Sequence, residues 1–262
     1  MSRLWSDHVA GLSPYVPGEQ VKLDNLLKLN TNEHPYGPSP KALEAIRQAA
    51  TDNLRLYPSY SAQELRDAVA HNHGVNANNV FLGNGSDEVL AHVFSALFLR
   101  GVRPVLLPDI TYSFYTTYCS YFGVPADIVP LREDFTLNVQ DYVRKRSLPP
   151  AGIIFANPNA PTGIPLSLED IEAILSANPD TTVVADEAYV YFGGTSSVGL
   201  LEKYDNLVVI QTMSKSRALA GLRVGYALAS ADIIQALERV KDSFNSYPMD
   251  TIAQVGAVAS LK

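Results

Sequence analysis

The segment from Thr212 to Gly225 contains one lysine and one arginine whose positions suggest chemistry. Lys215 follows the apolar run Leu207–Ile210, which has the composition of a buried strand, and Arg223 comes eight residues later. Charged side chains are almost never fully buried unless they are paired, so a lysine at the end of an interior strand needs a partner. Hydroxyl-bearing and small residues flank this lysine. The pattern therefore indicates that the two cations act on an anionic ligand.

Polar residues also follow a second apolar run, Val80–Leu82. The next residues, Gly83–Glu88, include two glycines that let the backbone approach a ligand closely. Ser86 and Asp87 stand at the expected start of a helix, whose free N–H groups can hold a phosphate. Taken alone, this pattern also fits an ordinary capped helix.

Two further apolar runs end in polar residues. The first, Gly152–Ala156, leads into Asn157–Gly163, where two prolines and a glycine fix the direction of Asn159. The second is followed directly by Asp186, a carboxylate that is costly to bury without a cation or hydrogen-bond donors. Tyr189 shares the direction of this carboxylate if a helical turn begins there. Each motif alone also fits a rigid turn or a helix cap.

Short apolar runs alternate with amphipathic helices along the chain. The expected strands are Val80–Leu82, Val105–Leu107, Ala126–Val129, Gly152–Ala156, Thr181–Ala185, Leu207–Thr212 and Arg223–Ala229. The expected helices are Lys41–Thr51, Ala62–His73, Asp87–Leu99, Thr111–Phe122, Leu168–Ala177, Ala231–Lys241 and Thr251–Lys262, and residues 1–40 are expected to be irregular. This order predicts an α/β fold with a mostly parallel sheet sandwiched by helices. Ligands of such sheets bind outside the carboxyl ends of the strands, where the polar residues above collect.

Composition narrows the class of protein. The 262 residues are 47% hydrophobic and 18% charged, which is ordinary for a globular enzyme. The net charge of −7 argues against nucleic acid or an anionic membrane as the main partner. No apolar run approaches the roughly 20 residues that cross a bilayer, and the N-terminus lacks a signal-peptide core. The single cysteine, Cys119, fits a reducing cytoplasm.

Taken together, the motifs fit one organic cofactor, pyridoxal 5′-phosphate. Its aldehyde needs a lysine for a Schiff base, and its ring nitrogen needs a carboxylate to remain protonated. Its phenolic oxygen needs donors such as Tyr189 and Asn159. Its phosphate needs a helix N-terminus and a cation. The five histidines have no zinc-like spacing, so no metal is expected.

The same residues carry a family resemblance. From about Ser13 to its last residue, the chain resembles the histidinol-phosphate aminotransferases, a family within the fold-type I, class II aminotransferases. The segments that carry the resemblance are Leu29–Pro40, Leu56–Pro58, Phe81–Val89, Ala156–Gly163, Val184–Tyr189, Thr212–Gly225 and Asn245–Pro248. The resemblance implies the large-domain fold of aspartate aminotransferase.

The resemblance implies a role for each residue at the cofactor's ring. Lys215 would bind the cofactor and then carry the proton removed from the substrate, and Asp186 would pair with the pyridinium nitrogen. Tyr189 and Asn159 would donate to the phenolic oxygen. Tyr112 would stack on the ring, although its aromatic surroundings also fit a core position.

The resemblance also implies a phosphate site and a partner subunit. The backbone of Ser86 and Asp87, the hydroxyl of Ser214 and the guanidinium of Arg223 would bind the phosphate. Tyr57 would reach that phosphate from the other subunit of a homodimer, although it also fits plain aromatic packing.

The implied domain organisation has an N-terminal segment, residues 1–35, that contributes to the substrate site and the small domain. In this segment, Tyr15 and Asn32 would line the substrate pocket. Residues 36–262 would form the large, cofactor-binding domain. The final Ala-rich stretch has no closing cap, and members of the family continue into a C-terminal small domain. We therefore expect the chain to be a fragment that lacks this domain, with little or no turnover.

The predicted function is transamination between histidinol phosphate and 2-oxoglutarate in histidine biosynthesis, in the cytoplasm. Two alternatives within enzymes are a sibling aminotransferase acting on aromatic amino acids and a threonine-phosphate decarboxylase. A third is a cofactor-binding module that is catalytically silent. A nucleotide-binding domain is disfavoured, because no dinucleotide fingerprint follows any strand.

Overall fold

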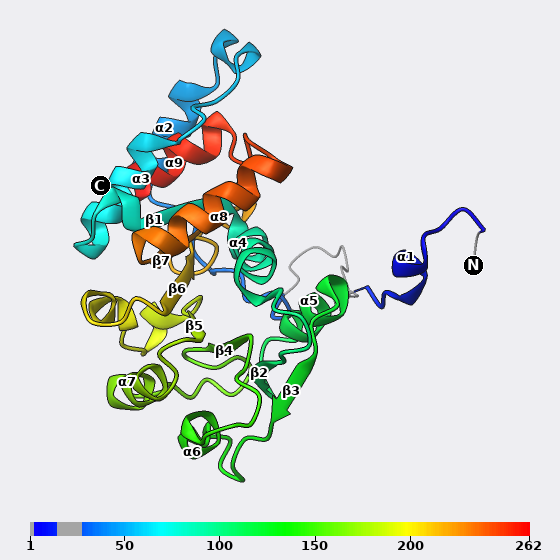
Figure 1. The fold of residues 1–262 in the computed structure, drawn as a ribbon. Coiled ribbons are helices and arrows are strands. Elements are labelled where there is room, and N and C mark those ends of the chain that lie inside the picture. The colour runs from blue at the N-terminus through cyan, green and yellow to red at the C-terminus, as the bar shows by residue number, and fades with distance from the viewer. Residues whose placement is uncertain (1–2, 15–27) are drawn as a thin grey trace.

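A seven-stranded sheet forms the centre of the molecule (Figure 1). The structure, a computed structural model, describes residues 3–14 and 28–262. The strands are β1 (Val80–Asn84), β2 (Val105–Pro108), β3 (Ala126–Val129), β4 (Gly152–Ala156), β5 (Thr182–Asp186), β6 (Leu207–Thr212) and β7 (Val224–Ala229). Their spatial order is β1-β7-β6-β5-β4-β2-β3. The expected α/β fold with a mostly parallel sheet is confirmed.

Strand β7 runs against all of its neighbours. Pairs β2–β3, β2–β4, β4–β5 and β5–β6 are parallel, whereas β7 is antiparallel to both β6 and β1. The start of β7 therefore lies at the edge where the other strands end. Val224 faces Asn84 of β1, and Gly225 faces Thr212 of β6. The reversal brings Arg223, just before β7, to the same edge as Lys215 just after β6.

Helices cover both faces of the sheet (Figure 1). The α-helices are α1 (Asp7–Gly11), α2 (Pro40–Ala49), α3 (Gln63–His73), α4 (Gly85–Val93), α5 (Phe114–Phe122), α6 (Val139–Val143), α7 (Leu168–Ala177), α8 (Ala231–Phe244) and α9 (Thr251–Leu261). Short 3-10 turns are η1 (Asp52–Arg55), η2 (Ala77–Asn79), η4 (Val190–Phe192), η5 (Ser197–Glu202) and η6 (Ala220–Leu222), and η3 (Phe94–Phe98) is a π-helical turn that continues α4. No helix in the described ranges is long and apolar enough to span a membrane.

The core has two layers, one on each face of the sheet. Side chains alternate between the faces along each strand. In β6, Val209 belongs to the layer under α3, α7 and α9, whereas Val208 belongs to the layer under α4, α5 and α8. Both layers are apolar, so the interior strands are apolar on both faces. This explains why the strands stand out in the sequence as continuous hydrophobic runs.

The structure differs from the sequence-based expectations mainly at the ends of helices. Helix α4 begins at Gly85 and not at Asp87, and α5 begins at Phe114 and not at Thr111. Helix α1 lies within the segment expected to be irregular, and α6 was not predicted. Both are five residues long, which is too short for a helical period to show.

Candidate active site

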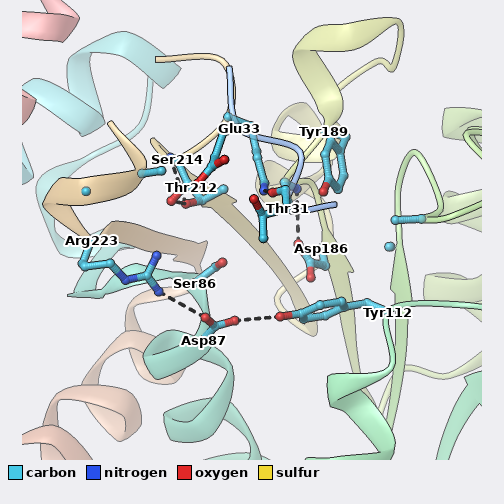
Figure 2. A pocket seen from close by; sticks show the side chains of 16 residues that line it. Thr31, Glu33, Ser86, Asp87, Tyr112, Asp186, Tyr189, Thr212, Ser214 and Arg223 are labelled. Atoms are coloured by element: carbon cyan, nitrogen blue, oxygen red, sulfur yellow. Dashed lines mark hydrogen bonds and ion pairs between the residues drawn. The ribbon is translucent and has the colours of Figure 1, made fainter. Parts of the chain in front are cut away.

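A cavity of about 400 Å³ opens at the carboxyl edge of the sheet, within the size range of small-molecule sites (Figure 2). Most of the residues singled out in the sequence meet there. The lining residues include Thr31, Ser86, Asp87, Tyr112, Ala160, Asp186, Tyr189, Thr212, Ser214, Lys215 and Arg223. The cavity therefore joins the ends of β1, β4, β5 and β6 with the start of β7.

The amine of Lys215 lies beside Tyr189. Lys215 Nζ is 5.6 Å from the centroid of the Tyr189 ring and donates a hydrogen bond to the backbone oxygen of Thr31 at 2.8 Å. The amide of Asn32 donates to the Tyr189 hydroxyl at 3.0 Å. The segment around residues 31–32 thus contacts both of these side chains from the N-terminal side of the chain. Asn32 has a φ of 51°, in the left-handed region that asparagine tolerates best after glycine.

Asp186 is a buried carboxylate at the end of β5, with 5% of its surface exposed. It accepts hydrogen bonds from the Tyr115 hydroxyl at 2.8 Å and the Ala188 N–H at 3.2 Å. Burial raises the pKa of Asp186 from 3.8 to about 6, although both hydrogen bonds act in the opposite direction. No ion pair among the described residues includes it. A cationic group in the cavity would supply the partner that it lacks.

The start of α4 packs closely against Arg223 and β7, because two glycines leave the space for it. Gly85 has a φ of 80°, and a Cβ there would meet the Arg223 guanidinium at 2.4 Å. A Cβ on Gly225 would meet the backbone nitrogen of Ser86 at 2.3 Å. The first turn of α4 therefore lies directly against β7. Its unpaired N–H groups and positive end of the helix dipole face the cavity beside a guanidinium.

Arg223 and Tyr112 converge on Asp87 from opposite sides (Figure 2). The guanidinium lies 3.1 Å from one carboxylate oxygen of Asp87, and the Tyr112 hydroxyl donates to the other at 3.0 Å. Arg223 has a φ of 51°, a backbone conformation that costs a non-glycine residue about 1–3 kcal/mol and is common at functional sites. Burial and the neighbouring Asp87 raise the pKa of Tyr112, so its hydroxyl remains a donor.

Ser214 lies inside the cavity with a neighbour that the sequence did not single out. The Thr212 hydroxyl donates to Ser214 Oγ at 3.0 Å, and both side chains are buried. Thr212 and Ser214 line the same cavity as Ser86 and Asp87 at the start of α4 (Figure 2). They add hydroxyl groups to the cavity beside Lys215.

The structure does not bring the Asn159 side chain to this cavity. Its amide nitrogen donates to the Ile110 backbone oxygen at 2.9 Å and to Thr162 Oγ1 at 3.1 Å, and its amide oxygen accepts from Thr111 Oγ1 at 2.9 Å. These bonds hold the loop after β4 to the loop after β2. The next residue, Ala160, lines the cavity instead. The expected donation from Asn159 into the cavity is therefore not what this geometry shows.

Tyr57 lies away from this cavity. Tyr57 is 84% exposed and packs on Tyr247, with ring centroids 5.0 Å apart, so it does not reach the cavity of its own chain. Tyr15 lies outside the described residues.

Sequence reasoning missed the partner that holds Asp186. Tyr115 is fully buried, and burial raises its pKa, which keeps its hydroxyl protonated as a donor to the carboxylate. A signal was present, because Tyr115 lies three residues after Tyr112 and shares its side of a helical turn. The two rings make an edge contact with centroids 5.6 Å apart.

The cavity combines three chemical features. It contains an amine nucleophile, a buried carboxylate with no cation, and a helix start with an arginine. These features suit a ligand with a reactive carbonyl, a cationic ring nitrogen and an anionic group. Among the described residues there is no cluster of His, Cys, Asp and Glu able to hold a metal ion.

Comparison with known sequences identifies the family that this chain matches. The chain matches the family described as "Aminotransferase class I and II" over residues 24–262. It is 59% identical over 262 residues to "Histidinol-phosphate aminotransferase 1" of Bordetella parapertussis, covering all of this chain and 73% of that relative. It is 58% identical to "Histidinol-phosphate aminotransferase" of Pseudomonas putida, covering all of this chain and 74% of that relative.

Comparison with solved structures agrees with the sequences. The structure of histidinol-phosphate aminotransferase from Sinorhizobium meliloti, solved in complex with pyridoxal-5′-phosphate, matches with a TM-score of 0.78 and 28% identity. The match covers 88% of this chain and 63% of that one.

The raised pKa of Asp186 predicts a pH-dependent effect of the substitution Asp186→Asn on the ligand-free protein. The folded state binds this proton more tightly than the unfolded chain, so stability is lost as the pH rises from about 4 to about 6, and the full cost of the Asp186 charge is present above pH 6. We expect the variant to be more stable than the parent at pH 8, by up to about 3 kcal/mol. The difference should shrink as the pH falls from 6 towards 4. Urea unfolding across this range measures it.

Asp134→Asn is the control for the sign of this effect. Hydrogen bonds from Thr136 lower the pKa of exposed Asp134, so its stabilisation is present at neutral pH and lost in acid. This variant should be less stable than the parent at pH 8 and converge with it at low pH. If Asp186→Asn behaved in the same way, Asp186 would not carry an uncompensated charge.

Proposed function

The chain belongs to the class I and II aminotransferases, and from this premise we propose that it transfers the amino group of L-histidinol phosphate to 2-oxoglutarate. The products are imidazole-acetol phosphate and L-glutamate, in histidine biosynthesis. One observation supports pyridoxal 5′-phosphate as the cofactor: the buried carboxylate of Asp186 and the amine of Lys215 line the same cavity. The names of the relatives support the choice of amino donor.

The cavity residues fit this cofactor. Asp186 lacks a cation, and a protonated pyridine nitrogen would supply one. The start of α4 and Arg223 suit a phosphate, because a guanidinium offers five N–H donors and can hold Asp87 and a phosphate together. Ser214 and Thr212 add hydroxyl donors. Tyr112 lines the cavity between Asp87 and Asp186, where its ring can cover a planar ligand.

When bound, the cofactor supplies an aldehyde that condenses with amines and a protonated ring that accepts the electron pair left on the substrate α-carbon. Lys215 would hold the cofactor through its amine and would be freed when the amino donor takes its place. The free Nζ would then accept the proton from the substrate α-carbon and return it to the cofactor. Asp186 would favour the protonated form of the ring nitrogen.

Tyr189 is the proposed donor to the phenolic oxygen of the cofactor. Its hydroxyl accepts a hydrogen bond from the Asn32 amide, which leaves the O–H proton free to point at the ligand. We assign Asn159 the task of holding the loop that presents Ala160, since its amide is already engaged. Donation from Asn159 to the phenolic oxygen of the cofactor stays a prediction.

The N-terminal segment, residues 1–35, is the proposed substrate side of the site, with residues 36–262 forming the cofactor-binding domain. Thr31 and Asn32 already contact Lys215 and Tyr189. A substrate that binds there displaces the Lys215–Thr31 hydrogen bond. Asn32 would then line the pocket of the amino donor.

We also propose a homodimer, located in the cytoplasm. An exposed aromatic face supports the dimer: Tyr57 packs on Tyr247, Tyr60 makes an edge contact with the same ring, and Phe244 is 81% exposed nearby in the sequence. Burying aromatic rings of this size against a second copy is a strong driving force for association. In that dimer, Tyr57 reaches the phosphate of the partner's cofactor. The buried, unpaired Cys119 supports a reducing compartment.

Substitution of Lys215 tests the covalent step. After incubation with pyridoxal 5′-phosphate and reduction with borohydride, we expect mass spectrometry of the digested protein to find the cofactor on Lys215. Lys215→Ala should lose this adduct, because no other lysine lines the cavity formed by the described residues. Lys145→Ala, which alters an exposed lysine, should keep it. An adduct spread over surface lysines, or none, would contradict the proposal.

A substrate panel tests the amino donor. We expect kcat/KM for histidinol phosphate to exceed that for phenylalanine or tyrosine by at least about 100-fold, with glutamate formation as the assay. A reversed preference would identify a sibling aminotransferase, and release of carbon dioxide from threonine phosphate would identify a decarboxylase. Trapping of the cofactor on Lys215 without turnover of any donor would identify a silent binding module.

Tyr57→Phe tests the shared site. Loss of a hydrogen bond to a charged phosphate should raise the Kd of the cofactor by at least about 10-fold without dissociating the dimer. Cofactor titration and sedimentation measure the two effects. Tyr60→Phe is the matched control, since the Tyr60 hydroxyl bonds to Asp242 of its own chain.

Hybrid dimers of Tyr57→Phe and Lys215→Ala subunits separate the two locations of this hydroxyl. If Tyr57 acts on the partner's site, each hybrid contains one intact site with the parent Kd. If all sites in the hybrid remain weak, Tyr57 acts within its own chain and the proposed arrangement is wrong.

A further inference from the structure

Glu187 is a second buried carboxylate, directly after Asp186, that the chemistry above does not use. It is 1% exposed and, like Asp186, belongs to no ion pair in the part of the chain that the structure describes. Side chains alternate along an extended segment, so these neighbours face opposite ways. Asp186 lines the cavity, whereas Glu187 does not.

Four donors occupy the Glu187 carboxylate. Oε1 accepts from the Ser197 N–H at 2.6 Å and the Ser197 hydroxyl at 2.8 Å. Oε2 accepts from the Ser196 hydroxyl at 2.6 Å and the Gln211 amide at 2.9 Å. Burial raises the pKa of Glu187, and these hydrogen bonds oppose that rise. An ionised carboxylate, which accepts at both oxygens and donates at neither, accommodates all four donors.

The four donors come from two segments, the start of η5 and the end of β6. Glu187 lies two residues before Tyr189, and Gln211 lies four residues before Lys215. Ser196 and Ser197 begin η5, which closes the turn that carries Tyr189. The Glu187 N–H also donates to the Ile210 backbone oxygen at 2.7 Å, so main chain and side chain both join β5 to β6. One carboxylate thus links the segment holding Tyr189 to the strand leading to Lys215.

Gln211 is held in one orientation from its other side. Its amide oxygen accepts from the Tyr226 hydroxyl at 2.9 Å, so its NH2 group must face Glu187. The Tyr226 hydroxyl in turn lies 3.1 Å from His73 Nε2. Burial, aided by Arg217, lowers the pKa of His73 to about 4, so this imidazole is neutral near pH 7. The hydrogen-bond chain therefore keeps its arrangement across the physiological pH range.

We infer that Glu187 is a positioning residue, whose carboxylate sets the separation between the Tyr189 hydroxyl and the Lys215 amine. This inference rests on the proposed function, in which those two groups act on the same cofactor. The turn after Tyr189 contains two consecutive glycines, Gly193 at a φ of 116° and Gly194, so no side chain of its own anchors it there. Without the carboxylate, the donors from η5 and β6 would be left buried and unpaired. The turn that carries Tyr189 and the strand that leads to Lys215 would then lose the side-chain hydrogen bonds that join them.

A pH titration of the absorbance of the cofactor bound at Lys215 distinguishes a positioning role from a purely structural one. Tyr189 next to the bound lysine sets the midpoint of this titration. In Glu187→Gln, the NH2 group of the new amide faces donors that previously met a carboxylate oxygen. Because this weakens the link between the turn that carries Tyr189 and the strand that leads to Lys215, we expect the midpoint of the titration to shift by about 1 pH unit. We expect kcat for the amino-donor half-reaction to fall by about 10-fold to 100-fold, with KM nearly unchanged.

The exchange Glu187→Gln with Gln211→Glu is the rescue variant. The double variant moves the carboxylate from position 187 to position 211 and restores one amide donor and one carboxylate acceptor across that hydrogen bond. Ser196 Oγ lies 3.5 Å from the Gln211 amide nitrogen and can donate to the new carboxylate. The double variant should return the midpoint and kcat to within about 3-fold of the parent. Glu172→Gln is the control, because it removes a carboxylate that binds Lys203 and Tyr204 away from the cavity.

The outcomes distinguish the two levels of the proposal. If the parent chain traps no cofactor, the proposed function fails. If the parent traps cofactor but Glu187→Gln keeps the parent midpoint and kcat, only the positioning role is wrong. The same conclusion follows if the double variant folds but restores neither. Should Glu187→Gln fail to fold, Ser196→Ala removes a single donor; it should shift the midpoint in the same direction, and an unchanged midpoint would overturn the inference.

Discussion

The reversed direction of β7 is the constraint on which the rest of the site depends. Six strands run in one direction and end at one edge, and β7, antiparallel between β6 and β1, begins there. This pairing puts Arg223 beside the start of α4 and close to the cavity wall that carries Lys215. The approach is possible because Gly225 has no side chain to strike Ser86. Backbone pairing alone therefore brings Lys215 and Arg223 to the same edge of the sheet.

Two adjacent carboxylates in the interior have opposite environments and therefore different tasks. Asp186 has two donors and an open cavity, so its charge is only partly compensated and attracts a cation. Glu187 has four donors and does not line the cavity. Its carboxylate joins the segment after β5 to the start of η5 and the end of β6. The negative charge of Glu187 also raises the pKa of Asp186. In the proposed enzyme, the two negative charges would favour a protonated, cationic ring nitrogen beside Asp186.

Much of the fold could be predicted because interior strands are apolar on both faces and stand out as continuous runs. Helix ends were less predictable: α4 begins at Gly85, where contact with Arg223 and β7 decides the boundary. Most cavity residues were also predictable, since polar residues directly after buried strands share one edge. Asn159 was the exception, because a turn can present either of two neighbouring side chains. Its hydrogen bonds to Ile110 and Thr162 turn it away from the cavity.

The sequence by itself determined which residues stand at the ends of the strands, and so Lys215, Asp186 and Tyr189 could be assigned to one site with a common cofactor. Covalent order is enough for this, because a side chain that follows an interior strand must emerge at the edge of the sheet. Only the tertiary structure decided what those residues touch. Tyr115 meets Asp186 across 71 residues of chain, and Glu187 finds its donors in two other segments. Such contacts depend on the packing of both layers of the core, which local patterns do not encode.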